Sequence, residues 1–262
     1  MKIVSWNMRR SKTGSPSWNY LKEIDPDIAL LQEVNEIPQE ISNIYSFRIR
    51  KARNKNGQDQ KFGTAVLVKG DILDEINLTS DLDWIKKEID HFRGNLLAYR
   101  VNTKDHQKIN IVSVYSPAWC IDSERIQDID VSGVKLDNNP DIWFTEILWK
   151  SLQYEKIDPN DSWVVAGDLN CSLTFDIKWG PRGNDQVIKR IEDLGFYECL
   201  RGIHKKVVPT FRTSRGHIED QIDHLFISSH LRNKLIDCSV GSHEVFDQSL
   251  SDHLPVIAEI RK

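Results

Sequence analysis

A carboxylate and an amide follow an apolar run near the middle of the chain. Residues 163–166 have the length and composition of a buried strand, and Asp168 and Asn170 come directly after it. Residues two apart on an extended chain point the same way, so these two side chains are expected to share one face. A carboxylate can accept a proton from water or bind a cation, and a neighbouring amide can hold the attacking oxygen. Alone, Asp-x-Asn is also a common turn after a strand.

Oxygen-bearing side chains also end two apolar runs near the N-terminus. Asn7 follows residues 3–6, and Glu33 closes the run that starts at residue 28. Such ligands suit a hard cation such as Mg²⁺ or Mn²⁺, which binds one or two carboxylates together with water and substrate phosphate. For either residue alone, the alternative is a strand-terminating turn or a solvated strand end.

A carboxylate and an imidazole, Asp252 and His253, stand side by side before the last predicted strand. Such an imidazole can act as a general base or donate to a developing oxyanion. Asp223 opens another apolar strand, where burial without a partner would be costly, so pairing with His253 is expected to satisfy it. The alternative is that Asp223 caps its strand in water. Tyr115 ends the predicted strand 109–115, where the alternative to a functional role is a half-buried structural tyrosine.

Six short segments, taken together, resemble those of the endonuclease/exonuclease/phosphatase superfamily, which includes exonuclease III-type DNA-repair enzymes and DNase I. They stand in the family's order at the ends of predicted strands and cover nearly the whole chain. The matching segments are Ile3-Val4-Ser5-Trp6-Asn7, Leu31-Gln32-Glu33, Val114-Tyr115-Ser116-Pro117, Gly167-Asp168-Leu169-Asn170, Ile222-Asp223-His224 and Ser251-Asp252-His253-Leu254-Pro255.

The resemblance implies a fold and a metal site. The implied fold is an α+β, four-layer α/β/β/α sandwich, in which two mixed β-sheets pack face to face and helices lie outside. The implied cofactor is Mg²⁺ or Mn²⁺, held by Glu33 with help from Asn7, and Asp252 is expected close to the metal.

The resemblance also implies catalytic roles. Asp168 and Asn170 would position the attacking water. His253, oriented by Asp223, would contact the scissile phosphate, and Tyr115 would contact the phosphate or the leaving group. Whether the aspartate or the histidine is the base stays open at this point.

Two segments depart from the DNA-repair branch of the family. After the tyrosine, exonuclease III-type sequences usually continue Val-Pro-Asn, whereas this chain has Ser116-Pro117-Ala118-Trp119. The Asn-Gly pair that normally follows the first tryptophan motif is replaced by Met8-Arg9-Arg10. Both differences argue against abasic-site endonuclease activity and leave phosphoester hydrolysis intact.

Patterning along the chain independently favours a mixed sandwich. Predicted strands outnumber helices and do not alternate regularly with them, which favours α+β over a doubly wound sheet. No composition shift marks a boundary, so residues 1–262 are expected to form one domain. The predicted strands are 3–6, 28–31, 65–68, 96–101, 109–115, 163–166, 222–227 and 256–260; the predicted helices are 18–24, 144–152 with Asp141 as a cap, and 187–194 with Gly195 at its C-terminus; the long irregular stretches are 48–63 and 118–140.

The charge of the chain limits its partners. A net charge of −4 and a pI of about 6.1 argue against a protein coated in basic residues for nonspecific duplex binding. Local basic segments remain candidates, namely residues 48–61 and the stretch with Lys178, Trp179 and Arg182, where the tryptophan could stack a base. A mobile hairpin and a packed loop aromatic are the respective alternatives. Trp119 is a further candidate contact, although its loop is acidic.

The sequence therefore predicts a Mg²⁺- or Mn²⁺-dependent phosphodiesterase, foremost a nuclease acting on DNA or RNA. A phosphatase or phosphodiesterase for a small or lipid-linked phosphate is the alternative, and a binding protein without catalysis is a third. The N-terminal residues are typical of a strand and not of a secretory signal, no apolar stretch has membrane-spanning length, and the four cysteines include no CxxC pair, so a cytoplasmic location is expected.

Overall fold

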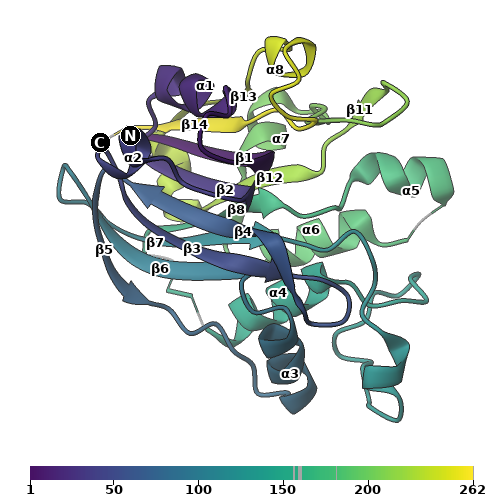
Figure 1. Ribbon diagram of the computed structural model, residues 1–262. Helices are drawn as coiled ribbons and strands as arrows, with labels where there is room; N and C mark the ends of the chain where they lie inside the picture. The colour runs from purple at the N-terminus through teal and green to yellow at the C-terminus, as the bar shows by residue number, and fades with distance from the viewer. Residues whose placement is uncertain (156, 159–160, 181, 262) are drawn as a thin grey trace.

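The computed structural model describes residues 1–155, 157–158, 161–180 and 182–261. Its first sheet has six strands in the order β13-β14-β1-β2-β4-β3 (Figure 1). Only β1 and β2 pair in parallel, so their carboxyl ends, which carry Asn7 and Glu33, meet at the same edge. The strands are β1 (Lys2–Ser11), β2 (Ile28–Val34), β3 (Ser46–Arg53), β4 (Asp59–Val68), β13 (Leu235–Val240) and β14 (Val256–Ile260).

The second sheet has six strands in the order β5-β6-β7-β8-β12-β9, of which only β7 and β8 pair in parallel. Its register places Asp168 beside Tyr115 on one side and beside Asp223 on the other. The strands are β5 (Gly70–Glu75), β6 (Leu96–Thr103), β7 (Lys108–Tyr115), β8 (Trp163–Asp168), β9 (Phe196–Glu198) and β12 (Asp223–Ser228), and a separate pair is formed by β10 (Phe211–Arg212) and β11 (Ile218–Asp220).

The two sheets pack face to face because alternate side chains on their central strands are apolar. Ile3 and Leu30 of the first sheet and Ile111 and Val164 of the second belong to one fully buried cluster. The residues between them, such as Val4, face outward and pack against helices. This arrangement gives the four layers expected from the sequence.

Helices cover both outer faces (Figure 1). On the first sheet lie α1 (Ser17–Ile24), α2 (Gln39–Ser42) and α8 (Glu244–Asp247); on the second lie α3 (Asp83–His91), α4 (Phe144–Tyr154) and α6 (Asn184–Glu192). Shorter connections contain α5 (Leu173–Trp179), α7 (Cys199–His204) and the 3₁₀ helices η1 (Ser123–Ile126) and η2 (Ser229–Lys234). In the described ranges, no helix is both long and apolar enough to cross a membrane.

The strand ends are tightly constrained just before the polar residues. A Cβ added at Gly167 would lie 1.9 Å from the carbonyl oxygen of Val114, so β7 and β8 can approach only with glycine there. On the first sheet, the register shifts between Asn7 and Ser11, and Arg9 and Arg10 have positive φ. Such bulges re-aim side chains at the edge of a sheet.

Two sequence expectations about the bounds of helices, strands and loops are wrong. Residues 48–63 are not an irregular loop, because β3 and β4 form a hairpin across them. Phe47 and Ile49 alternate there with arginines, as in an edge strand whose polar face is exposed. The many basic residues made this two-residue alternation hard to recognise in the sequence. Asp141 does not cap α4; the helix begins after Trp143, whose backbone N–H donates to the Glu146 carboxylate. The expected strands and the other two helices are present at nearly the expected positions.

Candidate active site

Three ionisable side chains meet where the two sheets join. Asp168 and Asp223 stand on neighbouring strands of the second sheet, and His253 comes from the segment before β14 of the first. They are 2%, 0% and 5% exposed, respectively. His253 Nδ1 lies 2.9 Å from Asp223 Oδ2, the pairing expected from the sequence, and His253 Nε2 lies 3.9 Å from Asp168 Oδ2.

Burial and mutual charge control protonation in this cluster. Burial raises the pKa of Asp168 to about 7, although the adjacent His253 opposes that rise. Burial works to lower the pKa of His253, but the carboxylates of Asp223 and Asp168 outweigh it and raise that pKa to about 10. The imidazole is therefore the more basic group and carries the proton.

The segment that carries His253 is anchored to the end of β1. The Ser251 hydroxyl donates to the backbone carbonyl of Asn7 at 2.6 Å and accepts from the backbone N–H of His253 at 3.1 Å. The Trp6 indole N–H donates to the carbonyl oxygen of His253 at 2.9 Å, and the Phe211 ring packs against the imidazole. These contacts hold the histidine of one sheet against the carboxylates of the other.

The Asp168 carboxylate is held by two amide groups. Asn7 Nδ2 donates to Oδ2, and the backbone N–H of Asn170 donates to Oδ1, each at 3.0 Å. Asn170 has a left-handed backbone (φ 48°), and its side-chain amide donates to the carbonyl of Ser116 at 2.8 Å. The expectation that strand alternation would put Asp168 and Asn170 on one face is wrong, because the chain is not extended at Asn170; the two residues meet through a turn.

Glu33 and Tyr115 face each other across the two sheets. The Tyr115 hydroxyl donates to Glu33 Oε1 at 3.1 Å, and Arg10 Nε lies 3.8 Å from Glu33 Oε2. Burial, with the nearby charges of Glu33 and Asp168, raises the pKa of Tyr115 well above its usual value, so the phenol stays neutral. The Tyr115 hydroxyl can therefore donate or accept a hydrogen bond, but it does not act as a charged phenolate.

Two arginines lie at the rim of the site and were noted in the sequence only as a departure from the family pattern. Arg9 Nε lies 3.8 Å from Asp252 Oδ2, and Arg10 pairs with Glu33. Both pairs are partly exposed and thus weak. Their positions follow from the positive φ of both arginines, a conformation that arginine itself does not signal. The sequence therefore gave no indication that these cations would face Glu33 and Asp252.

Two sets of groups could hold a cation. Asp168, Asp223 and His253 offer ligand atoms within 4.8 Å of one another, but a cation there would compete with a charged imidazole. The expected set of Glu33, Asn7 and Asp252 offers oxygen atoms only. Glu33 is 18% exposed at the side chain, so its carboxylate is accessible and backed by protein. Oxygen ligands of this type are the ones that a hard cation such as Mg²⁺ prefers.

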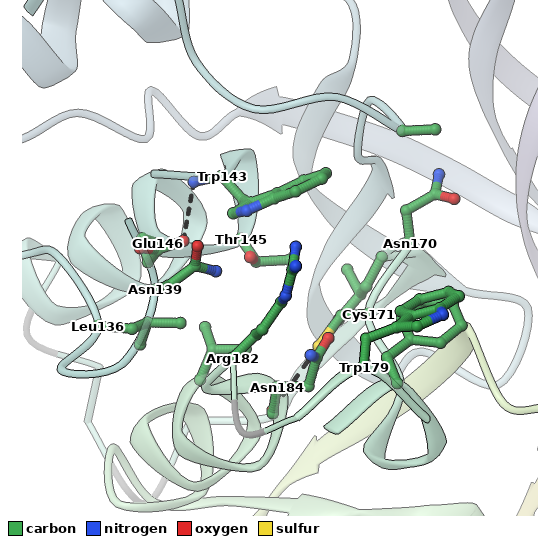
Figure 2. Close-up of a pocket in the computed structure, with 14 residues that line it drawn as sticks. Leu136, Asn139, Trp143, Thr145, Glu146, Asn170, Cys171, Trp179, Arg182 and Asn184 are labelled. Carbon is green, nitrogen blue, oxygen red and sulfur yellow. Dashed lines mark hydrogen bonds between the residues drawn. The ribbon is translucent and has the colours of Figure 1, made fainter. Parts of the chain in front are cut away.

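The residues expected to contact substrate differ in whether their charge or ring is free to do so. Lys178 Nζ pairs with Asp220 at 2.7 Å and Glu219 at 3.0 Å, so its charge is already balanced. Trp179 and Arg182 line a cavity beside Asn170 (Figure 2). Trp119 does not line this cavity, and its buried indole N–H has no hydrogen-bond acceptor among the described residues.

A sequence model described as the Endonuclease/Exonuclease/phosphatase family matches residues 4–253. The chain belongs to this family. Its members are phosphoester hydrolases, and the match includes every residue of the cluster described above. A search of curated protein sequences finds no match.

Solved structures of the family's fold superimpose on the whole chain. An AP endonuclease from Archaeoglobus fulgidus has a TM-score of 0.68 and 21% identity, covering 99% of both chains. A 3′-5′ exonuclease from Neisseria meningitidis has a TM-score of 0.66 and 19% identity over 100% of both chains. The endonuclease domain of the retrotransposon TRAS1 has a TM-score of 0.59 and 18% identity, covering 100% of this chain and 98% of that one. At these identities, the likeness establishes the fold.

The charge balance of the cluster can be measured without substrate. Asp223→Asn removes the carboxylate that most strongly raises the pKa of His253, so that pKa should fall from about 10 toward its ordinary value of 6.5. The parent imidazole should stay charged as the pH rises through neutrality, whereas the variant should lose its proton there. NMR titration of the histidine rings in metal-free buffer measures both. Asp252→Asn is the matched control and should lower the pKa of His253 by less, because Asp252 contributes less to it. An unchanged His253 pKa in Asp223→Asn would contradict the pairing of His253 with Asp223.

Proposed function

We propose that this chain is a Mg²⁺- or Mn²⁺-dependent nuclease that hydrolyses phosphodiester bonds of DNA or RNA. The observation that carries the proposal is the convergence of Asp168, Asp223 and His253, three buried ionisable groups from two sheets, at one edge of the sandwich. Packing alone has no reason to build such a cluster. The nucleases among the similar structures, and a Neisseria 3′ phosphatase bound to a product DNA hairpin, support nucleic acid as the substrate.

In this proposal Asp168 is the general base. Asn7 and the backbone N–H of Asn170 fix both of its oxygens, so the carboxylate can be aimed at an attacking water. Its pKa of about 7 lies near the pH at which a base transfers protons most effectively. The proton of the water passes to Asp168 as the water oxygen bonds to phosphorus, the bond from phosphorus to the leaving oxygen breaks, and the leaving oxygen takes up a proton from solvent. Asn170 would help to position the attacking water.

His253 then acts as a donor and not as the base. Asp223 holds Nδ1, and Nε2 has no hydrogen bond within the described residues. A protonated imidazole in this position donates from Nε2 to a phosphoryl oxygen, where charge develops in the transition state. The neutral hydroxyl of Tyr115 donates to Glu33 in this structure, and on release from Glu33 it would be a second donor to the phosphate or the leaving group.

Glu33, with Asn7 and Asp252, would hold the metal ion, which when bound neutralises charge on the phosphoryl oxygens. Arg9 and Arg10 lie against these same carboxylates and are available to the phosphates of the substrate. A cytoplasmic location is also proposed, supported by four cysteines that form no disulfide.

A second candidate is a phosphatase or phosphodiesterase for a small or lipid-linked phosphate. Ala118 in place of the asparagine of the DNA-repair branch favours it, since one phosphate contact of that branch is missing. A binding protein without catalysis is disfavoured, because all expected catalytic residue types are present.

Substitutions at Asp168 and His253 test catalysis directly. Asp168→Ala and His253→Ala are each expected to lower turnover of the best nucleic-acid substrate by about a hundred- to ten-thousandfold, the usual contribution of proton-transfer groups. Asp223→Asn should cost less, because it misorients the ring without deleting it. Turnover is measured by steady-state kinetics and the fold by melting temperature, with the exposed His230→Ala as control. Near-parental rates for both alanine variants would place the site elsewhere.

Removing the metal tests the cofactor. EDTA should abolish turnover, and Mg²⁺ or Mn²⁺ should restore it. Glu33→Gln should bind Mn²⁺ at least tenfold more weakly by isothermal titration, because it removes the charge of the main oxygen ligand. Glu40→Gln, on the exposed face of α2, is the matched control and should bind as the parent does. Full turnover in metal-free buffer, or parental Mn²⁺ affinity in Glu33→Gln, would refute the assignment.

A further inference from the structure

A cavity of about 280 Å³ adjoins the proposed site (Figure 2). It lies between the start of α4, helix α5 and the start of α6, next to the point where β7 and β8 end. Asn170 lines it, and the backbone N–H of the same residue donates to Asp168. One residue thus connects the cavity to the carboxylate proposed as the base.

The cavity has aromatic walls. Trp143 and Trp179 come from different elements and lie on different sides of it (Figure 2). The Trp179 indole packs on Phe175, with ring centroids 4.6 Å apart, and Trp179 is still 59% exposed. A large aromatic ring that is held in place and left open to a cavity is suited to stacking against a flat ligand.

Polar groups at the cavity are available for hydrogen bonds. The Arg182 side chain extends into the cavity, and within the described part of the chain its guanidinium makes no hydrogen bond or ion pair (Figure 2). Asn139 is buried; its amide oxygen accepts from the backbone N–H of Asp141, which leaves its amide N–H groups as donors. The neighbouring Lys178 is neutralised by Asp220 and Glu219, so Arg182 supplies the local positive charge.

We propose that this cavity receives one unstacked nucleobase of the substrate, from a nucleotide beside the phosphodiester bond that is cut. This inference rests on the proposed nuclease function and adds a preference to it. Stacking on Trp143 and Trp179 is tolerant of base identity, while Arg182 and Asn139 offer donors to the edge of the base or to the adjacent phosphate. A base that is paired and stacked within a duplex cannot enter. Single strands and frayed ends are therefore the preferred substrates.

The test compares substrates that differ only in their bases. A single-stranded oligonucleotide, the same strand in a duplex, and an oligomer of abasic nucleotides with the same charged backbone are incubated with the parent and Mg²⁺ or Mn²⁺. The parent should cut the single strand with a KM about tenfold lower than that for the abasic oligomer, because only the former can fill the cavity. The continuous duplex should be the poorest of the base-bearing substrates.

Variants assign this preference to the cavity. In Trp179→Ala, Trp143→Ala and Arg182→Gln, the KM for the single strand should rise about tenfold, toward the value for the abasic oligomer. Ile177→Ala is the matched control, because Ile177 is on the same short helix as Trp179, is 83% exposed and does not line the cavity. Melting temperatures check folding, and the exposed Trp179 and Arg182 keep the test valid if Trp143→Ala is unstable.

The outcomes separate the two proposals. A parent that cuts the single strand and the abasic oligomer with equal KM, or cavity variants that keep the preference, would overturn the base pocket and leave the nuclease function standing. A parent that cuts none of the three substrates, and hydrolyses only small phosphate esters, would overturn both.

Discussion

Burying three ionisable groups together is the constraint on which the site depends. Asp168, Asp223 and His253 would each be costly to bury alone, and removing either member of the Asp223–His253 pair leaves its partner without that compensation. The fold offsets this cost by bringing the three groups together. The strand register places Asp168 opposite Asp223, and the segment that carries His253 is hydrogen-bonded to β1 at Asn7 of the other sheet. The close approach of β7 and β8 at Gly167 belongs to the same arrangement.

Much of this could be predicted from the sequence, for physical reasons that are local. Apolar runs ending in polar residues indicate strand ends, and a lone carboxylate such as Asp223 in an apolar strand requires a partner, which the structure supplies as His253. Strand and helix patterning indicated a mixed α+β sandwich, and the four layers were implied by the family resemblance of six short segments. The hairpin across residues 48–63 was missed because basic side chains interrupted its alternation.

What could not be predicted depends on backbone conformation or on distant pairing. The positive φ of Arg9 and Arg10 has no signal in residue type, since arginine does not favour that conformation. The left-handed turn at Asn170 is different, because asparagine is a common turn residue, and the strand alternation was followed one residue too far. The pairing of Lys178 with Asp220 joins residues 42 positions apart, so the sequence presented the lysine as a free cation when the fold neutralises it. The cavity beside Asn170 likewise requires three helices to be in place.

The central claim is a division of labour: the buried cluster handles protons, and the oxygen ligands around Glu33 hold the metal. Anomalous diffraction from a crystal soaked in Mn²⁺ tests this division most directly. The account predicts a manganese peak at the Glu33 carboxylate, with the hydrogen bond between Asp223 and His253 intact. A peak enclosed by Asp168, Asp223 and His253, with the imidazole turned away from Asp223, would contradict it.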